Sequence, residues 1–255
     1  MTSQKTIYIK IGGSTITEKS LGYPKPRIER IKDFCREVKE LVDLGISLIL
    51  AHGGGSYAHP FAAKYGLDRG LNPKCRIGIT ETRFWLTELS QIFLREFLEI
   101  RLPVVVFHPS SLIYKSSKGW EFYSSPIKLA LMNGITPLLM GDVVFDENRG
   151  VSIISADDIP FLLLDMIDEI LFLVDVPGVL DESGKIIRKL HKEDLAHLEE
   201  VRDLAKDVTG GIKEKIKKGM ILAEKGKKVR ISGYKKKGDL LKALKGLAGT
   251  EILAK

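Results

Sequence analysis

The sequence predicts an α/β fold built on a mainly parallel sheet. Short β-like runs alternate with amphipathic helical stretches along the 255 residues, a pattern typical of parallel strands joined by helical crossovers. Glycine-rich turns directly follow several of the apolar runs. No low-complexity linker divides the chain, so we expect one domain with two lobes.

The first elements are a strand, a helix and a second strand. Residues 6–11, TIYIKI, form the first expected strand and end in a Gly-Gly-Ser turn. Apolar residues recur at helical spacing over residues 28–42, and Gly45 is expected to stop that helix. The strand 46–51, ISLILA, then leads into three consecutive glycines.

The same alternation continues to the C-terminus. A second apolar helical stripe covers residues 80–100, and residues 142–154 are read as a hairpin that turns at 146–150. A lysine-rich helix is expected after the glycines at 210 and 211, and a last short helix at 238–246. Further strands are expected at residues 103–107, 135–140, 169–174 and 227–231.

Composition describes an ordinary soluble globular protein, with 44% apolar and 29% charged residues. Three acidic residues interrupt the densest apolar run, residues 159–174, and the N-terminus has no signal-peptide pattern. We therefore expect no membrane span and a cytoplasmic location. Cys35 and Cys75 have no metal-ligand spacing and are read as reduced structural thiols.

The net charge of +7 is concentrated near the C-terminus, where residues 210–239 carry ten lysines and one arginine. Such a run usually forms a solvated face, and the alternative is contact with a polyanion such as nucleic acid. Tyr234 is the only aromatic residue within this run, and no nucleic-acid-binding motif is recognisable. We expect no nucleic-acid partner.

Three glycine turns, at residues 11–14, 52–56 and 209–211, suit the binding of phosphate. Without a Cβ atom, backbone N–H groups can approach a phosphate closely. The P-loop pattern does not occur. Gly53, Gly55 and Ala58 match a dinucleotide fingerprint, which leaves a dehydrogenase as an alternative, but Asp68 comes too early to bind the ribose.

Three lysines stand beside these turns. Lys10 immediately precedes the first turn, Lys19 follows it, and Lys215 lies one helical turn beyond the third. A lone lysine is usually solvated, but phosphoryl transfer requires positive charge and fixed donors around the γ-phosphate. The arrangement therefore indicates a phosphoryl-transfer site.

Six segments in order resemble the amino acid kinase superfamily and, within it, the isopentenyl phosphate kinases. They cover nearly the whole chain: IKIGGSTITEK, HGGGSYAHP, MGDVV, ISADD, DVPGVL and DVTGGIKEK. The resemblance implies a three-layer αβα sandwich with a mainly parallel central sheet. It also implies an acceptor lobe at about residues 1–150 and an ATP lobe at about 151–255, with ATP and Mg²⁺ as cofactors, isopentenyl phosphate as acceptor and a homodimeric enzyme of isoprenoid biosynthesis.

The resemblance also implies which residues bind the nucleotide. Lys10 and the turn at 12–14 would contact the ATP phosphates, and Gly55 the transferring phosphate. Lys19 is similar to the family's transition-state-stabilising lysine, and no metal-ligating side chain is implied. The implied nucleotide-binding residues are Lys10, Gly12, Gly13, Ser14, Gly55, Asp175, Gly178, Gly211 and Lys215.

On the acceptor side, the resemblance implies Gly54, His59, Ala156 and Asp157. His59 takes the place of the family histidine that hydrogen-bonds the acceptor phosphate, a role that suits an imidazole able to donate and to gain a proton. Asp157 resembles the aspartate that orients the active-site lysines.

Neighbouring residues receive no role in the chemistry. Asp158 is read as a solvated or helix-capping residue, and His52 as a residue that shapes its loop. Ala58 and Ala156 stand where related enzymes usually have glycine, and we expect the added methyl groups either to narrow the phosphate site or to change its backbone angles.

A C5 alkenyl phosphate requires a phosphate cradle and an apolar cup. We expect one or two residues of the following set to line that cup: Phe84, Trp85, Leu89, Tyr123 and Ile127. A phosphonate kinase of the fosfomycin-resistance type, which shares the acceptor histidine, is the main alternative, and a uridylate-type kinase is a weaker one.

Overall fold

A computed structural model describes residues 5–18, 23–194 and 210–254. Its main sheet has eight strands in the order β10-β12-β11-β9-β1-β2-β6-β3. Neighbouring strands are parallel except β11 and β12, which are antiparallel. The strands are β1 (Thr6–Ile11), β2 (Ser47–His52), β3 (Val104–Val106), β6 (Thr136–Met140), β9 (Glu169–Val174), β10 (Lys189–His191), β11 (Lys228–Gly233) and β12 (Thr250–Leu253). The predicted α/β fold with a mainly parallel sheet is confirmed.

A second, four-stranded sheet has the order β5-β4-β7-β8. β7 (Asp142–Asp146) and β8 (Gly150–Ile154) are antiparallel and form the hairpin that the sequence predicts, with Asp146 paired to Gly150. β4 (Ile113–Ser116) and β5 (Gly119–Phe122) form another hairpin, which the sequence reading did not foresee.

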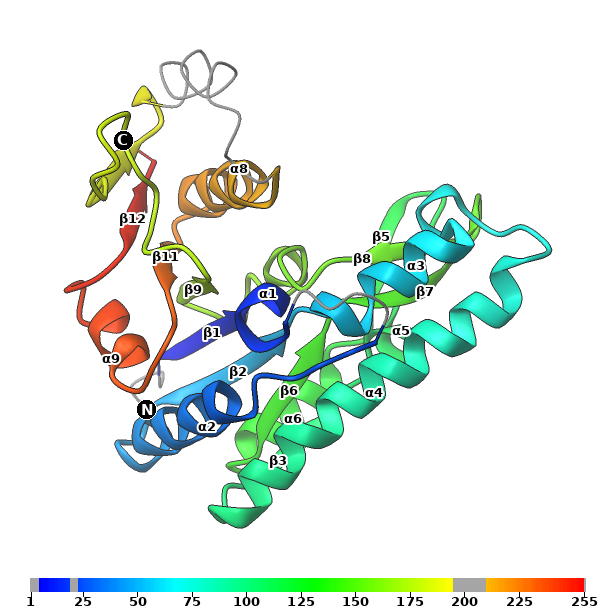
Figure 1. Ribbon diagram of the computed structural model, residues 1–255, viewed down its shortest axis with the longest axis horizontal. Helices are drawn as coiled ribbons and strands as arrows, with labels where there is room; N and C mark the ends of the chain where they lie inside the picture. The colour runs from blue at the N-terminus through cyan, green and yellow to red at the C-terminus, as the bar shows by residue number, and fades with distance from the viewer. Residues whose placement is uncertain (1–4, 19–22, 195–209, 255) are drawn as a thin grey trace.

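Helices cover both faces of the main sheet (Figure 1). Ile7, Ile9 and Ile11 of β1 pack with α2, α4 and α9 in one apolar cluster, whereas Tyr8 belongs to a second cluster with α6 and α8. Side chains alternate across a strand, so Lys10 lies on the same face as Tyr8. The helices are α1 (Gly13–Ile16), α2 (Ile28–Asp43), α3 (His59–Tyr65), α4 (Cys75–Glu99), α5 (Pro109–Leu112), α6 (Ser125–Met132), α8 (Gly210–Glu224) and α9 (Asp239–Leu244).

The carboxyl ends of the central strands bring the glycine turns together. β1 pairs with β2 in a register that places Ile11 opposite His52, and β9 lies on the other side of β1 with Leu173 opposite Ile11. The loops that follow these three strands therefore start at the same edge of the sheet, where α/β proteins commonly bind their ligands.

Two further features concern the cysteines and the length of the apolar helices. Cys35 and Cys75 are both buried and free, as the sequence reading expected. Among the described residues, no helix is both long and apolar enough to cross a membrane.

Candidate active site

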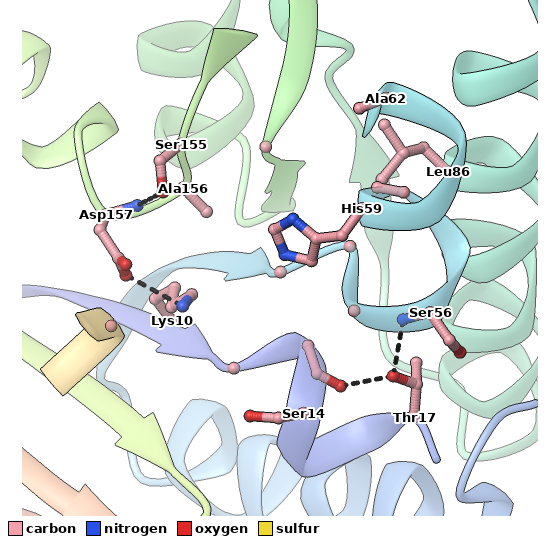
Figure 2. A pocket seen from close by; sticks show the side chains of 18 of the residues that line it. Lys10, Ser14, Thr17, Ser56, His59, Ala62, Leu86, Ser155, Ala156 and Asp157 are labelled. Carbon is pink, nitrogen blue, oxygen red and sulfur yellow. Dashed lines mark hydrogen bonds and ion pairs between the residues drawn. The ribbon is translucent and has the colours of Figure 1, made fainter. Parts of the chain in front are cut away.

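A cavity of about 580 Å³ opens at this edge of the main sheet. Figure 2 shows side chains from several parts of the chain around it. Most of the residues proposed from sequence line it: Lys10, Gly12, Gly13, Ser14, Gly54, Gly55, His59, Ala156, Asp157, Asp175, Gly211 and Lys215. Gly178 does not line it; a Cβ atom there would meet Thr250 and Ile186 instead. Lys19 lies outside the described residues.

Two glycine loops touch each other at the cavity. We call residues 12–14 the first glycine loop and residues 53–56 the second glycine loop. A Cβ atom on Gly13 would lie 2.1 Å from the backbone nitrogen of Gly55, and one on Gly53 would lie 2.6 Å from that of Gly13. Gly55 also has a positive φ of 52°. Only bare backbone allows this contact, so both loops expose peptide groups to one cavity.

Asp157 holds two lysine side chains that line the cavity. Its Oδ1 lies 2.9 Å from Nζ of Lys10, and its Oδ2 lies 3.1 Å from Nζ of Lys215, which also donates to the carbonyl of Gly211 at 3.0 Å. The ammonium groups come from β1 and α8. One carboxylate thus orients two cations, and the cluster keeps a net positive charge that suits a polyphosphate.

Burial and charge shift the pKa values in this cluster. Burial raises the pKa of Asp157, but the charges of Lys10 and Lys215 outweigh it and hold that pKa below its usual value. Burial lowers the pKa of Lys10; Asp157 opposes this shift, and the positive charge of Lys215 adds to it. Asp157 is therefore ionised at neutral pH and helps to keep Lys10 charged.

Two hydrogen bonds hold the backbone next to Asp157. The hydroxyl of Tyr8 donates to the carbonyl of Ala156 at 2.7 Å, and the backbone N–H of Asp157 donates to Oγ of Ser155 at 3.2 Å. Burial, together with the charges of Asp157 and Asp158, raises the pKa of Tyr8 well above its usual value, so this donor stays protonated.

Asp158 makes a contact that the sequence did not reveal. It occupies the N-cap position of a short 3₁₀ helix, Ile159–Leu162, but its side chain makes no capping hydrogen bond. Its Oδ1 lies 2.6 Å from Nζ of Lys218, one helical turn beyond Lys215 on α8. Asp158 therefore stands at the capping position and is partly exposed, as expected, but its carboxylate pairs with a lysine of α8 and does not cap the helix.

His59 begins α3, and its side chain points into the cavity (Figure 2). Pro60 follows in the first turn, where its missing N–H is tolerated. The residue is nevertheless exposed to solvent. Partial desolvation, followed by the positive charges of Lys10 and Lys215, lowers the pKa of His59. The ring is therefore neutral at neutral pH until an anion approaches it.

A model of the amino acid kinase family matches residues 5–233. The chain belongs to the amino acid kinase family. Isopentenyl phosphate kinase of Methanocaldococcus jannaschii is 34% identical over 262 residues, covering 96% of this chain and 97% of that protein. The enzyme of the same name from Methanothermobacter thermautotrophicus is 31% identical over 271 residues, covering 98% and 99% respectively. An X-ray structure of isopentenyl phosphate kinase matches with a TM-score of 0.81 at 26% identity, covering 97% of this chain and 99% of its own.

His52 in this member of the family is a buried scaffold residue, as the sequence reading expected. Its Nε2 lies 2.9 Å from Oγ of Ser90, and its ring stacks on Phe93 with centroids 5.2 Å apart. Burial is the main cause that lowers its pKa, to about 4, although a hydrogen bond to the carbonyl of Gly53 opposes the shift. His52 therefore ties the end of β2 to α4.

The apolar end of the cavity is formed by residues that the sequence reading missed. They are Ala62, Leu86, Val143 and Ile153. None of the five predicted cup residues lines the cavity, so that prediction was wrong. Leu89 and Ile127 are in the core, Phe84 and Tyr123 are largely exposed, and Trp85 stacks on Phe61.

Proposed function

We propose that this chain transfers the γ-phosphate of ATP to isopentenyl phosphate and yields isopentenyl diphosphate and ADP. The observation that carries the proposal is the composition of the cavity. It joins two backbone phosphate cradles and the Lys10–Asp157–Lys215 cluster to an apolar end in one cavity. Relatives named isopentenyl phosphate kinase, at least 30% identical over nearly the full chain, support the same acceptor.

In the proposed reaction, the first glycine loop binds the ATP phosphates together with Lys10 and Lys215. Gly54 and His59 hold the acceptor phosphate, and Gly55 contacts the phosphoryl group in transit. An anionic oxygen of the acceptor attacks the γ-phosphorus, and the bond to the ADP oxygen breaks. The acceptor oxygen needs no general base because it is already ionised. The fixed positive charges reduce repulsion between the two phosphates and stabilise the charge that develops.

His59 and Lys19 have supporting roles in this proposal. His59 donates a hydrogen bond to the acceptor phosphate, and its pKa rises when that anion binds. Lys19 lies outside the described residues, and its proposed role in stabilising the transition state rests on the resemblance in sequence.

We propose that Mg²⁺ enters the site with ATP. The described residues contain no group of three or more His, Cys, Asp or Glu side chains that could hold a metal ion, and Asp157 is already paired with two lysines. This arrangement fits a cation held mainly by phosphate oxygens and water. Bound there, Mg²⁺ would neutralise charge on the β- and γ-phosphates.

The two lobes, the assembly and the location are also proposals. His59 and three of the four residues of the apolar end lie within residues 1–150, which supports an acceptor lobe there; Ile153 lies just beyond that range. Asp175, with Gly211 and Lys215, supports an ATP lobe at residues 151–255, although the first glycine loop also contributes to that side. We further propose a cytoplasmic homodimer, whose mass light scattering on purified protein measures directly.

A panel of acceptors tests the proposed function. Purified protein with Mg-ATP is offered isopentenyl phosphate, fosfomycin, uridylate and acetylglutamate in parallel, and ADP release is measured. We expect isopentenyl phosphate to be preferred by at least about 10² in kcat/KM, because the other acceptors leave polar groups unpaired in the apolar end. Preference for fosfomycin would instead favour the phosphonate kinase, and equal release with every acceptor would contradict the proposal.

A further inference from the structure

The hydroxyl of Thr17 joins the two glycine loops. Its Oγ1 donates to the carbonyl of Gly13 at 2.8 Å and accepts from the backbone N–H of Ser56 at 3.1 Å (Figure 2). Thr17 is only 2% exposed, so water does not compete readily for these bonds. One side chain thus spans from the first glycine loop to the second, across 39 positions of sequence.

The rest of Thr17 is fixed from the opposite side. Its carbonyl accepts a hydrogen bond from Nε of Arg27 at 3.1 Å. Thr17 also forms an isolated antiparallel β-bridge with Pro26. Its backbone N–H also donates to the carbonyl of Gly13 at 2.8 Å. The backbone of Thr17 is therefore held in place. Its hydroxyl, which accepts from Ser56, fixes the position of the Ser56 amide relative to that backbone.

Space around the hydroxyl is tightly limited. A Cβ atom on Gly55 would lie 2.2 Å from Oγ1 of Thr17 and 2.7 Å from the carbonyl oxygen of Gly13. The left-handed backbone at Gly55 turns the N–H of Ser56 toward Thr17 in the space left by the missing side chain. The hydrogen bond between Thr17 and Ser56 therefore requires glycine at position 55.

In-line transfer depends on the distance between two phosphates, each of which is held by a different loop. We propose that Thr17 is a positioning residue that fixes the first glycine loop relative to the second, and so fixes the donor phosphate relative to the acceptor. This inference rests on the proposed function for the identity of the two phosphates. Thr17 also lines the cavity, but its hydroxyl proton is donated to the carbonyl of Gly13, so in this account the residue acts through the backbone of Gly13 and Ser56.

The test compares Thr17→Val, which keeps the shape and removes the hydroxyl, with Thr17→Ser, which keeps the hydroxyl. Thr15→Val is the matched control, because Thr15 is fully buried in the adjacent turn and its hydroxyl has no hydrogen-bond partner among the described residues. We expect Thr17→Val to lower kcat by about 10–10², since small misplacements of reacting groups cost this much. Thr17→Ser and Thr15→Val should stay within about threefold of wild type on the same reasoning.

Binding measurements separate positioning from simple binding. The Kd of a non-hydrolysable ATP analogue and the Kd of isopentenyl phosphate, each measured alone, should change less than about threefold in Thr17→Val, because each loop still binds its own phosphate. Wild-type kcat in Thr17→Val would overturn the inference. So would a loss confined to the two Kd values, or a loss of kcat that Thr17→Ser does not rescue.

Hydrogen exchange at the Ser56 amide tests the link without any turnover. We expect slow exchange in wild type and Thr17→Ser, and clearly faster exchange in Thr17→Val than in Thr15→Val. Fast exchange in wild type would overturn the inference even if Thr17→Val does not fold. If the wild-type protein does not phosphorylate isopentenyl phosphate but its Ser56 amide exchanges slowly, the proposed function is contradicted. The hydrogen-bonded link between the two loops is supported in that case.

Discussion

Lys10 and Asp157 form a buried ion pair, with Nζ of Lys10 2.9 Å from Oδ1 of Asp157 and side chains only 6% and 10% exposed. Taking two such charges out of water is costly, and their attraction repays this only when both partners are present. The pair therefore positions Lys10 for chemistry more than it stabilises the fold. Asp157 also positions Lys215, through its Oδ2.

Replacing Asp157 by asparagine tests this pair. The change leaves two buried or half-buried ammonium groups without a counter-charge, so we expect the free energy of unfolding to fall by about 3 kcal/mol or more. Turnover should fall at least about 10²-fold, because the lysines lose their orientation. Denaturant titration and steady-state kinetics measure both effects.

Asp158→Asn is the matched control for stability. Its partner Lys218 and Asp158 itself are partly exposed, so we expect a loss of at most about 1 kcal/mol. Equal losses of stability in the two variants would contradict the account of Asp157.

His59→Ala should remove chemistry and leave the fold intact. We expect kcat to fall by about 10²–10³, as for other preorganised donors. The free energy of unfolding should change by less than about 0.5 kcal/mol, because the side chain is open to solvent. His191→Ala is the control, because His191 lies in β10 and does not line the cavity. Near wild-type turnover of His59→Ala would remove this histidine from the mechanism.

His52 predicts a specific dependence of stability on pH. Its pKa of about 4 in the folded chain lies below the ordinary value of 6.5, so only the unfolded chain takes up a proton between these values. His52 therefore has no unfavourable effect on stability above pH 6.5, and its effect lowers stability by about 3 kcal/mol at most as the pH drops toward 4. Unfolding titrations of wild type and His52→Gln should differ in slope within this window, and parallel curves would argue against the shift.

Gly54 and Ala58 should show strong coupling. Gly54 has ordinary helical φ and ψ angles, but a Cβ atom there would lie 2.2 Å from Cβ of Ala58. We expect Gly54→Ala to cost about 1–3 kcal/mol through overpacking, and Ala58→Gly to recover most of that loss in the double variant. A double-mutant cycle of unfolding free energies measures this. Additive effects would show that the two methyl groups do not compete for the same space.

Much of the fold followed from local patterns. β1 and β2 are apolar runs followed by glycines, as predicted, and their parallel pairing brings the two glycine loops together. Several short elements were missed because three or four residues carry little periodicity. β10 and β12, for example, contain only KLH and TEIL, and their place in the sheet depends on tertiary packing. β3, which is also short, was recognised from its run of valines.

Site residues were predictable where a motif surrounds them and not otherwise. Lys10, His59 and Asp157 stand in recognisable segments, and all three line the cavity. Thr17 was missed because its partner lies 39 positions away. The apolar cup was wrongly placed because α4 has apolar residues on several faces. The contacts of α3 and the β7–β8 hairpin, rather than spacing within α4, leave Leu86 facing the cavity.

The central claim is that the acceptor atom is a phosphate oxygen of isopentenyl phosphate. Phosphorus NMR of a reaction containing purified protein, Mg-ATP and isopentenyl phosphate observes the bond that forms. We predict coupled signals of a new alkyl diphosphate that grow as the monophosphate signal and the γ-phosphate of ATP decline together. An unchanged monophosphate signal while ATP is consumed would contradict the account.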